Sequence, residues 1–222
     1  MPFKLCLILI CAVACPAIAQ DQPAPNFIAE GQGVPGGVAR IAFAHHLYAL
    51  GLANKDALTV LNAARLAASV TLTDTPRAHK ATGDPAEIAD ASALPPAQMF
   101  DSAASLAALD EGLLDLIDAS KREAAFTPII SVVSTTSTLA AAQTDAWTLS
   151  FFGGSLAELA ILGDLSGNLG LQVTDETGNL VCKGAGASTV AYCSFNPAVN
   201  ATFTASVTNK SSAAITYQLL TN

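Results

Sequence analysis

Residues Thr148 to Asn222 read TLSFFGGSLAELAILGDLSGNLGLQVTDETGNLVCKGAGASTVAYCSFNPAVNATFTASVTNKSSAAITYQLLTN. This stretch contains seven short runs in which apolar and polar residues alternate, and Gly, Asn and Asp separate the runs. Alternation with a period of two is the pattern of a strand with one buried face. Short strands at this spacing are typical of antiparallel sheets that pack face to face, and a parallel sheet would need longer connections. The sequence therefore predicts a β-sandwich here.

Two of the five cysteines, Cys182 and Cys193, lie inside this stretch, and they bracket one of its turns. An even pair of cysteines in an oxidising compartment is typical of a disulfide. Bridging would close a short loop and stabilise the fold by about 3 kcal/mol on chain-entropy grounds. Two free thiols are the alternative.

The other end of the chain predicts export. Residues 1–19 begin with a positive charge at Lys4, continue with a short apolar run and end in Ala-Ile-Ala, which is the pattern of a secretory signal peptide. The run is shorter than the about 20 residues that a membrane-spanning helix needs. A lipid anchor at Cys15 is a minor alternative, because the residues before it weakly resemble a lipidation signal. We therefore expect a periplasmic or extracellular protein without a membrane span.

The charge of the chain excludes two classes of partner. The sequence has 10 Lys and Arg residues against 18 Asp and Glu residues, a net charge of −8. Nucleic acids bind to faces rich in Lys and Arg, and anionic membrane surfaces attract basic segments. We expect neither as a partner.

The first half of the exported chain predicts helices. Residues 20–37 are rich in Pro, Gly and Gln and are expected to form a flexible lead. Apolar residues then recur at helical spacing over 38–53 and 55–70, which predicts two helices joined by a tight turn. A polar loop is expected over 71–83. A short helix that Asp84 begins and Pro95 ends would follow it.

One long helix is expected over 96–124, with Asp101 near its start and Lys121 near its end to suit the helix dipole. Together these segments predict a small α-helical bundle over 38–126. A linker with a first strand would follow over 127–144, and the β-sandwich would occupy 145–222. The predicted fold class is thus α+β and multidomain, with an N-terminal helical bundle followed by a C-terminal antiparallel β-sandwich.

Several short motifs of the C-terminal stretch resemble the bacterial pre-peptidase C-terminal domain and its secreted relatives. They are Phe152-Gly153-Gly154, Gly163-Asp164, Asn168 to Val173, Asp175 to Asn179, Phe195-Asn196-Pro197, Val207-Thr208-Asn209 and Tyr217-Gln218-Leu219. The resemblance covers about 75 residues. It implies a small β-sandwich at the end of an exported protein. Relatives with a helical region before the sandwich lack an obvious enzyme, and this chain is similar to those.

The resemblance also suggests a calcium site. The central strand of the family often reads Asp-Leu-Asp-Leu, and its acids help to hold a cation, but here Asn168 and Gly170 stand at those two positions. The remaining oxygen donors are Asp164, Asn168, Asp175 and Glu176. Calcium takes six to eight oxygen ligands, so this set is depleted. We expect turn-forming roles for these residues and no cofactor, with calcium as the alternative.

No catalytic constellation is evident in the sequence. His45 and His46 are neighbours on a helix and point in different directions, and His79 lies in the expected loop without an identifiable partner. Ser155 and Ser188 lack the surroundings of a nucleophile. The Gly-x-Gly-x-x-Gly pattern that begins at Gly31 has no strand–helix context for a dinucleotide, and a flexible lead explains it better.

Two functions of different classes remain. The first is an exported, non-catalytic binding module of the periplasm or cell envelope, whose partner is a protein, a glycan or a second copy of the chain. The alternative is a weakly marked secreted hydrolase, or an accessory module of one, with paired carboxylates between the helices and the sandwich. Outward-facing Tyr192, Phe195 or Phe203 would favour a glycan. The sequence names neither the partner nor the oligomeric state.

Overall fold

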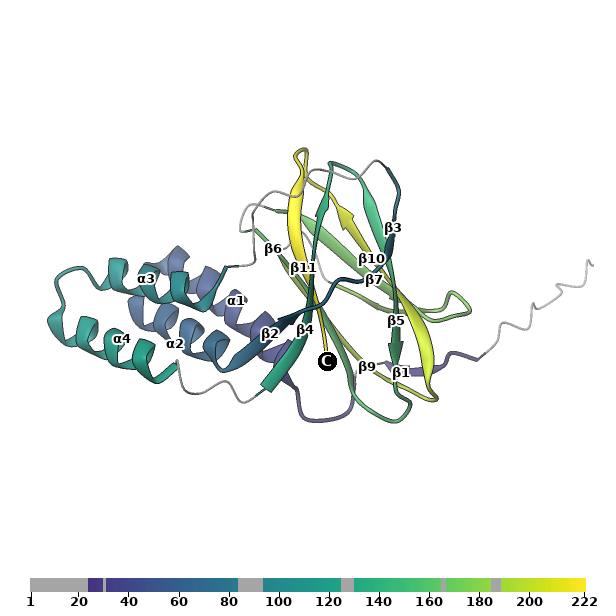
Figure 1. The fold of residues 1–222 in the computed structure, drawn as a ribbon, viewed down its shortest axis with the longest axis horizontal. Coiled ribbons are helices and arrows are strands. Elements are labelled where there is room, and N and C mark those ends of the chain that lie inside the picture. Colours follow the sequence, from purple (N-terminus) through teal and green to yellow (C-terminus); the bar gives the residue numbers. More distant parts are fainter. Residues whose placement is uncertain (1–23, 30, 84–93, 125–129, 165–166, 185–188) are drawn as a thin grey trace, which may run out of the picture.

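A computed structural model describes residues 24–29, 31–83, 94–124, 130–164, 167–184 and 189–222. The described chain is α+β and forms three layers (Figure 1). Helices make the first layer, a six-stranded sheet lies in the middle and a five-stranded sheet forms the third layer. No helix among these residues has the length and hydropathy to cross a bilayer.

The six-stranded sheet is antiparallel except at one edge, where β2 runs parallel to β4. Its last strand in the chain, β11, lies between β6 and β4. In spatial order its strands are β1 (Phe27–Ala29), β9 (Val190–Pro197), β6 (Ala157–Gly163), β11 (Ile215–Thr221), β4 (Ile130–Leu139) and β2 (Val70–Asp74).

The five-stranded sheet is antiparallel throughout. In spatial order its strands are β3 (His79–Ala81), β5 (Thr144–Phe151), β10 (Ala201–Asn209), β7 (Leu169–Thr174) and β8 (Leu180–Lys183). The alternating side chains of both sheets meet in one apolar core, where Trp147, Phe195, Phe203 and Tyr217 are almost completely buried. The two packed sheets agree with the alternation, but the sheets are not confined to 145–222 and not purely antiparallel: β1 to β4 come from earlier in the chain, β4 occupies part of the expected linker, and β2 runs parallel to β4.

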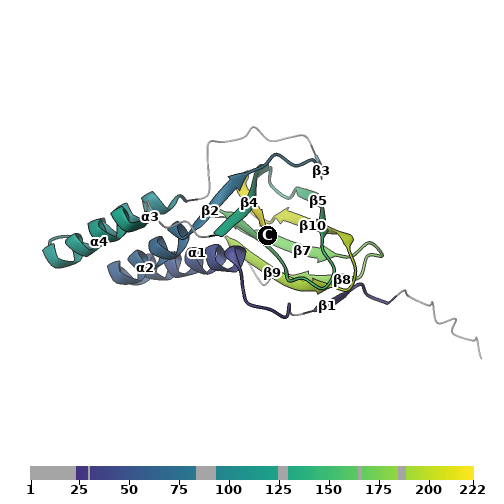
Figure 2. The same cartoon turned by 60° about the horizontal axis from the view of Figure 1, so that its bottom comes forward.

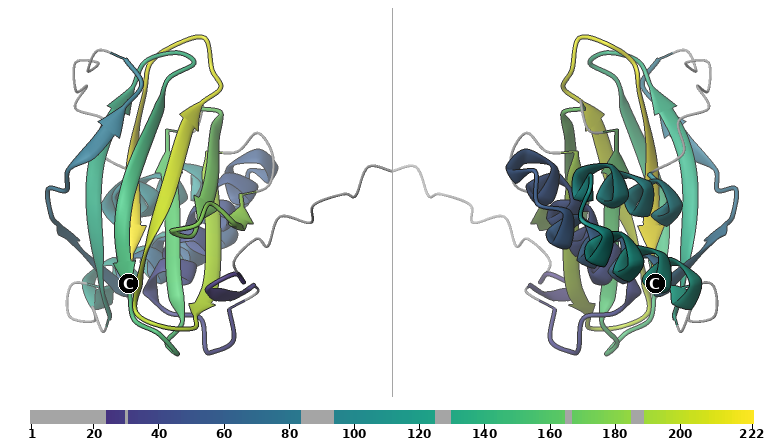
Figure 3. Two further views of the ribbon diagram at one scale, coloured as in Figure 1. Left: turned by 90° about the vertical axis from the view of Figure 1, so that its right-hand side faces the viewer. Right: turned by 90° about the vertical axis from the view of Figure 1, so that its left-hand side faces the viewer.

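The four helices of the described residues lie on the outer side of the six-stranded sheet, where the first two contact the sheet and the last two pack on the second helix and on each other (Figure 3). They are α1 (Gly37–Asn54), α2 (Ala57–Ala68), α3 (Pro96–Ala107) and α4 (Glu111–Ala124). A second apolar core joins the helices to outward-facing residues of the sheet such as Ala160, Leu162 and Leu220. Every residue of β6 and β11 is consequently buried, because both faces of these strands are covered.

The long helix expected over 96–124 is wrong, since two helices occupy that range. Ala108 has a positive φ of 52° and ends α3, and the side chain of Asp110 accepts the backbone N–H of Leu113 at the start of α4. The two helices pack together, and Lys121 of α4 pairs with Asp101 of α3 at 2.7 Å. The short helix expected from Asp84 lies outside the described residues.

The segment expected as a polar loop over 71–83 contains two strands, one in each sheet. β2 adds to the edge of the six-stranded sheet and β3 to the edge of the five-stranded sheet, so residues 75–78 cross from one sheet to the other (Figure 1). The side chain of Arg77 in this crossing donates to the Thr135 and Thr221 hydroxyls and to the Leu219 carbonyl. We name residues 70–81 the crossing segment.

The described part of the lead expected to be flexible, residues 24–29 and 31–36, is held against the sandwich. β1 pairs with β9, and the chain then passes beside that strand before it enters α1 (Figure 2). The backbone N–H of Gly31 donates to the Ser194 carbonyl. A Cβ atom on Gly31 would collide with Leu156, and one on Gly36 would collide with the carboxylate of Glu158. The Gly-x-Gly-x-x-Gly pattern therefore serves close packing in this structure.

Candidate functional site

A hollow that combines apolar walls with buried polar groups lies between the helices and the outer face of the six-stranded sheet, with a volume of about 420 Å³. We name it the helix–sheet pocket. Its volume is within the range of small-molecule sites. Its lining comes from α1, α2, the entry to α3, β2, β4 and β11 and comprises Ile41, His45, Ala67, Val70, Leu72, Asp74, Leu94, Pro95, Pro96, Ser134, Thr136 and Gln218.

The floor of this pocket is polar because the outer face of the sheet changes character along its strands. On β4, Val132 faces the apolar core under the helices, and the next two residues on the same face are Ser134 and Thr136. On β11, which runs in the opposite direction, Leu220 faces that core. Gln218, two residues earlier on the same face, lies directly opposite Thr136 in the strand register. The period of two therefore places three polar side chains side by side beyond the edge of the apolar core.

Two of these polar groups are buried without a hydrogen-bond partner among the described residues. Ser134 is 2% exposed, and Gln218 is 8% exposed. The Ser134 Oγ and Gln218 Oε1 atoms accept and donate no hydrogen bond there. Such an unpaired group costs about 1–3 kcal/mol, so native proteins seldom retain one without a reason. Both atoms belong to residues of the same cavity wall.

His45 contributes an uncharged imidazole to the pocket. It lies on the inward face of α1 and is 6% exposed. Burial, and secondly the neighbouring charge of His46, lower the pKa of His45 from 6.5 to about 4. The side chain is therefore neutral at pH 7, with one nitrogen as donor and the other as acceptor.

The charge at the pocket is a single carboxylate. Asp74, the last residue of β2, is exposed and lines the cavity, and no Lys or Arg is among the lining residues. The Arg77 side chain, three residues further on, is bonded to Thr135, Thr221 and Leu219. The pocket thus has an acidic group at an exposed position and neutral polar groups on its floor.

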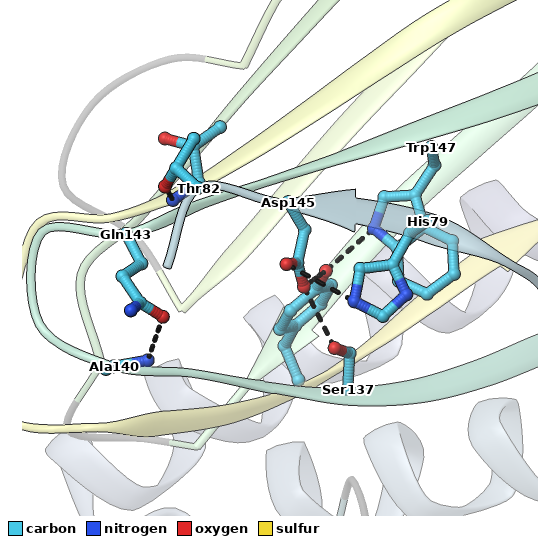
Figure 4. A network of polar contacts seen from close by, with 9 residues as sticks. His79, Thr82, Ser137, Ala140, Gln143, Asp145 and Trp147 are labelled. Carbon is cyan, nitrogen blue, oxygen red and sulfur yellow. Dashed lines mark hydrogen bonds and ion pairs between the residues drawn. The ribbon is translucent and has the colours of Figure 1, made fainter. Parts of the chain in front are cut away.

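A second polar cluster joins the crossing segment to the interior of the sandwich (Figure 4). The buried Asp145 carboxylate accepts hydrogen bonds from the Tyr217 hydroxyl at 2.7 Å and the Ser137 hydroxyl at 2.9 Å, and His79 Nε2 lies 3.4 Å from it. The His79 ring stacks on Trp147 at 4.2 Å, and the indole N–H donates to the Tyr217 hydroxyl. Burial and the bond to Asp145 raise the pKa of Tyr217.

This cluster corrects the expectation that His79 has no partner. Its geometry anchors a strand and does not activate a nucleophile, because the Ser137 hydroxyl donates to the carboxylate and not to the imidazole. Sequence reasoning missed the pair because His79 and Asp145 are 66 positions apart and only the crossing segment brings them together.

The four calcium candidates lie in two pairs at opposite ends of β7. Asp164 and Asn168 precede this strand, and Asp175 and Glu176 follow it. Six residues of strand separate the pairs by about 20 Å, so the four do not form one site. No group of three or more His, Cys, Asp or Glu side chains with metal-binding geometry occurs among the described residues. A calcium ion at one end of β7 could therefore be bound by only two of these four candidates.

Asp175 organises the turn between β7 and β8. Its carboxylate accepts hydrogen bonds from the backbone and side chains of Thr177 and Asn179, and from the backbone N–H of Asn26 in the lead. Burial raises the pKa of Asp175, and these hydrogen bonds outweigh it and lower the pKa to about 2. Glu176 accepts the backbone N–H of Thr202. The turn-forming role expected for Asp175 agrees with this geometry.

Cys182 and Cys193 form a disulfide that links β8 of one sheet to β9 of the other. The bridge therefore joins the two layers of the sandwich as well as closing a loop. Phe195 and Phe203 are buried between the sheets, and Tyr192 lies under the helices with its hydroxyl on Glu158. None of these three aromatic side chains forms the outward platform that a glycan would favour.

Glu158 is the buried carboxylate between the helices and the sheet, where the hydrolase alternative requires a pair. Its two oxygens accept the backbone N–H of Gly36 at the start of α1, and one also accepts the Tyr192 hydroxyl. A carboxylate at this position stabilises the positive end of the helix dipole. Its geometry is that of a helix cap.

Little in the sequence alone indicates the helix–sheet pocket. The sequence places His45 on a helix without identifying a partner, and no motif marks Asp74, Ser134, Thr136 or Gln218 as site residues. The one available signal was the polar content of the strand over 130–139, whose Ser and Thr residues were interpreted as linker-like.

No protein-family model and no curated protein matches this chain. Among solved structures, the pre-peptidase C-terminal domain of a collagenase from Bacillus anthracis is similar over 40% of this chain and 87% of its own, with 16% identity and a TM-score of 0.36. The family that the sequence motifs resemble is thus present among the structural neighbours.

Two other solved structures are similar over parts of the chain. Aeromonas hydrophila PliG, a periplasmic inhibitor of g-type lysozyme, matches 41% of this chain and 84% of its own, with 11% identity and a TM-score of 0.33. The C-terminal CBM6 of LamC, a marine laminarinase from Zobellia galactanivorans, matches 37% and 75%, with 12% identity and a TM-score of 0.24.

Proposed function

We propose that this chain is an exported, non-catalytic binding module and that it holds a small, largely apolar ligand in the helix–sheet pocket. One observation carries the proposal: Ser134 and Gln218 place unpaired, buried polar atoms on the floor of an apolar-walled cavity of about 420 Å³. A ligand that pairs with these atoms would remove the cost of leaving them unpaired. Apolar walls with few polar groups are typical of sites for small molecules.

The state of the buried carboxylates supports a binding role over the hydrolase alternative. Asp145, Glu158 and Asp175 each accept hydrogen bonds that anchor a strand, a helix start or a turn. A glycosidase needs two carboxyl groups that face the same bound substrate. The lining of the helix–sheet pocket contains one carboxylate, that of Asp74, and therefore lacks the second carboxyl group that a glycosidase needs.

Binding is tested with N-phenyl-1-naphthylamine, an uncharged and largely apolar dye that fluoresces when it leaves water. We expect a saturable increase in fluorescence with one dye molecule per chain. Thr136→Phe fills the pocket from its floor and should weaken dye binding at least tenfold. Thr138→Phe is the matched control, because Thr138 lies on the same strand and face outside the pocket lining.

The result is informative only if both variants remain folded, which circular dichroism and thermal unfolding establish. Unsaturable binding by the wild-type protein, or equal binding by both variants, would refute the pocket as the ligand site.

Export is a separate part of the proposal and has its own test. A disulfide persists in oxidising compartments, and residues 1–19 have the pattern of a signal peptide. Sequencing the N-terminus of the protein from a periplasmic or culture fraction should give Gln20 as the first residue. A mature chain that begins at Cys15 and carries a lipid would instead establish membrane anchoring.

A larger partner in the cell envelope is the second candidate, and Phe152 favours it. This side chain is 75% exposed beside a shallow hollow of about 380 Å³ at the end of the sandwich. Exposed aromatic side chains beside a hollow are common in protein interfaces. Phe152→Ala should then weaken recovery of an envelope protein or glycan from cell extracts. Unchanged recovery would exclude this end of the sandwich.

A further inference from the structure

We infer that the ligand of the helix–sheet pocket is an uncharged amphiphile whose head group donates a hydrogen bond, such as a hydroxyl or a primary amide. The inference rests on the proposed function and names the chemical class of the ligand. It follows from three features of the pocket: the kind of polar atom left unpaired, the charge of the lining and the apolar walls.

The unpaired atoms require a donor. Gln218 Oε1 is a carbonyl oxygen and can only accept, and Ser134 Oγ can accept as well as donate. The neutral His45 ring adds an acceptor nitrogen to the same cavity. With the Gln218 amide oriented as in the structure, a head group that only accepts, such as an ester, would leave the Oε1 atom unpaired. A hydroxyl or amide would satisfy it.

The charge of the lining disfavours ionised ligands. The lining contains no Lys or Arg that could pair with an anion, and the imidazole of His45 is neutral. The negative charge of Asp74 would repel an anion. An ammonium group at the floor would find no buried carboxylate there, since Asp74 is exposed. Burying an unpaired charge costs far more than burying a neutral polar group. A neutral head group is therefore the one that the floor accommodates.

The walls accept an apolar tail. Ile41, Ala67, Val70, Leu72 and Leu94 contribute aliphatic side chains around the polar floor. Leu72 is among the exposed large apolar residues of the chain, so a tail that contacts it would cover apolar surface now facing water. The pocket thus offers polar contacts at one wall and apolar contacts on the others, which is the complement of an amphiphile.

Four ten-carbon molecules test the inference by displacing N-phenyl-1-naphthylamine at pH 7. They are 1-decanol, methyl decanoate, decanoate and decylammonium, which share a tail and differ in head group. A hydrogen bond to a buried unpaired acceptor is worth about 1–3 kcal/mol, which corresponds to about 5–150-fold in affinity. We expect 1-decanol to bind at least fivefold more tightly than each of the other three.

Gln218→Leu removes the proposed acceptor while keeping an apolar side chain of similar length. It should reduce the preference for 1-decanol over methyl decanoate, measured as a ratio within the variant, to less than twofold. Thr216→Val is the matched control on the same strand and face, outside the pocket lining, and should preserve the preference.

Each outcome has a distinct meaning. Equal or tighter binding of the ester, the carboxylate or the ammonium would overturn the inference while leaving the pocket as a binding site. A preference that survives in Gln218→Leu would do the same. Failure of the dye itself to bind would refute the proposed function, and the inference with it.

Discussion

The acid sensitivity of this fold should depend on His45. Its pKa is about 4 in the folded chain, against 6.5 when it is solvated, because burial disfavours the charged ring. Below pH 6.5 the unfolded chain takes up a proton at this position that the folded chain does not. The stability that this difference provides is therefore fully present above pH 6.5 and is lost as the pH falls towards 4.

The magnitude follows from the two pKa values. A difference of 6.5 against about 4 corresponds to about 3 kcal/mol over the whole range, of which about 2 kcal/mol is lost by pH 5. Urea unfolding at pH 8 and pH 5 measures the loss. In His45→Gln the loss between these two pH values should be about 2 kcal/mol smaller than in the wild-type protein, because glutamine does not titrate.

His46 supplies the matched control, since it is the next residue on the same helix and is exposed. His46→Gln should retain most of the wild-type pH dependence. The reasoning would be refuted by equal pH dependence in His45→Gln and the wild-type protein. An NMR titration in which the His45 ring becomes protonated near pH 6.5 would refute it independently.

Three further changes test the supports of the fold. Asp175→Asn should lower the free energy of unfolding by about 2 kcal/mol at neutral pH, as measured by urea unfolding. Because the pKa of Asp175 is lowered to about 2, the wild-type chain loses this stability between about pH 4 and pH 2, and the variant should not. An unchanged acid profile would contradict this. Gly36→Ala should cost about 1–3 kcal/mol by thermal unfolding, since its Cβ would displace the Glu158 carboxylate, and equal stability would exclude that crowding. Replacing Cys182 and Cys193 together by Ala should cost about 3 kcal/mol, and reductant should then have no further effect on the variant.

Local patterning was enough to predict the strands that have one covered and one exposed face. In β5 and β10 the alternation is clear, because Trp147, Leu149 and Phe203 face the core and the residues between them are more exposed. The disulfide partners were also predictable, since only two cysteines follow residues 1–19. The first two helices show the same success, because their apolar periodicity is local.

The parts that could not be predicted depend on contacts between distant segments. β2 and β3 are short, mostly exposed edge strands: β2 alternates only over Val70 to Thr73, directly after the helical pattern of α2, and the three residues of β3 show no alternation. They become strands because β4 and β5 offer unpaired edges. The pocket was hidden for the same reason, since Ser134 and Gln218 are 84 positions apart and meet only in the paired sheet.

The position of β11 has a consequence for how the chain matures. The ten other strands and the four helices of the described residues precede it in the chain, yet it lies in the interior of the six-stranded sheet between β4 and β6. Until residues 215–221 leave the ribosome, β4 and β6 have no common neighbour and the two halves of that sheet stay unjoined. Such long-range pairing makes folding slow. The six-stranded sheet can therefore close only after β11 has emerged and inserted between β4 and β6.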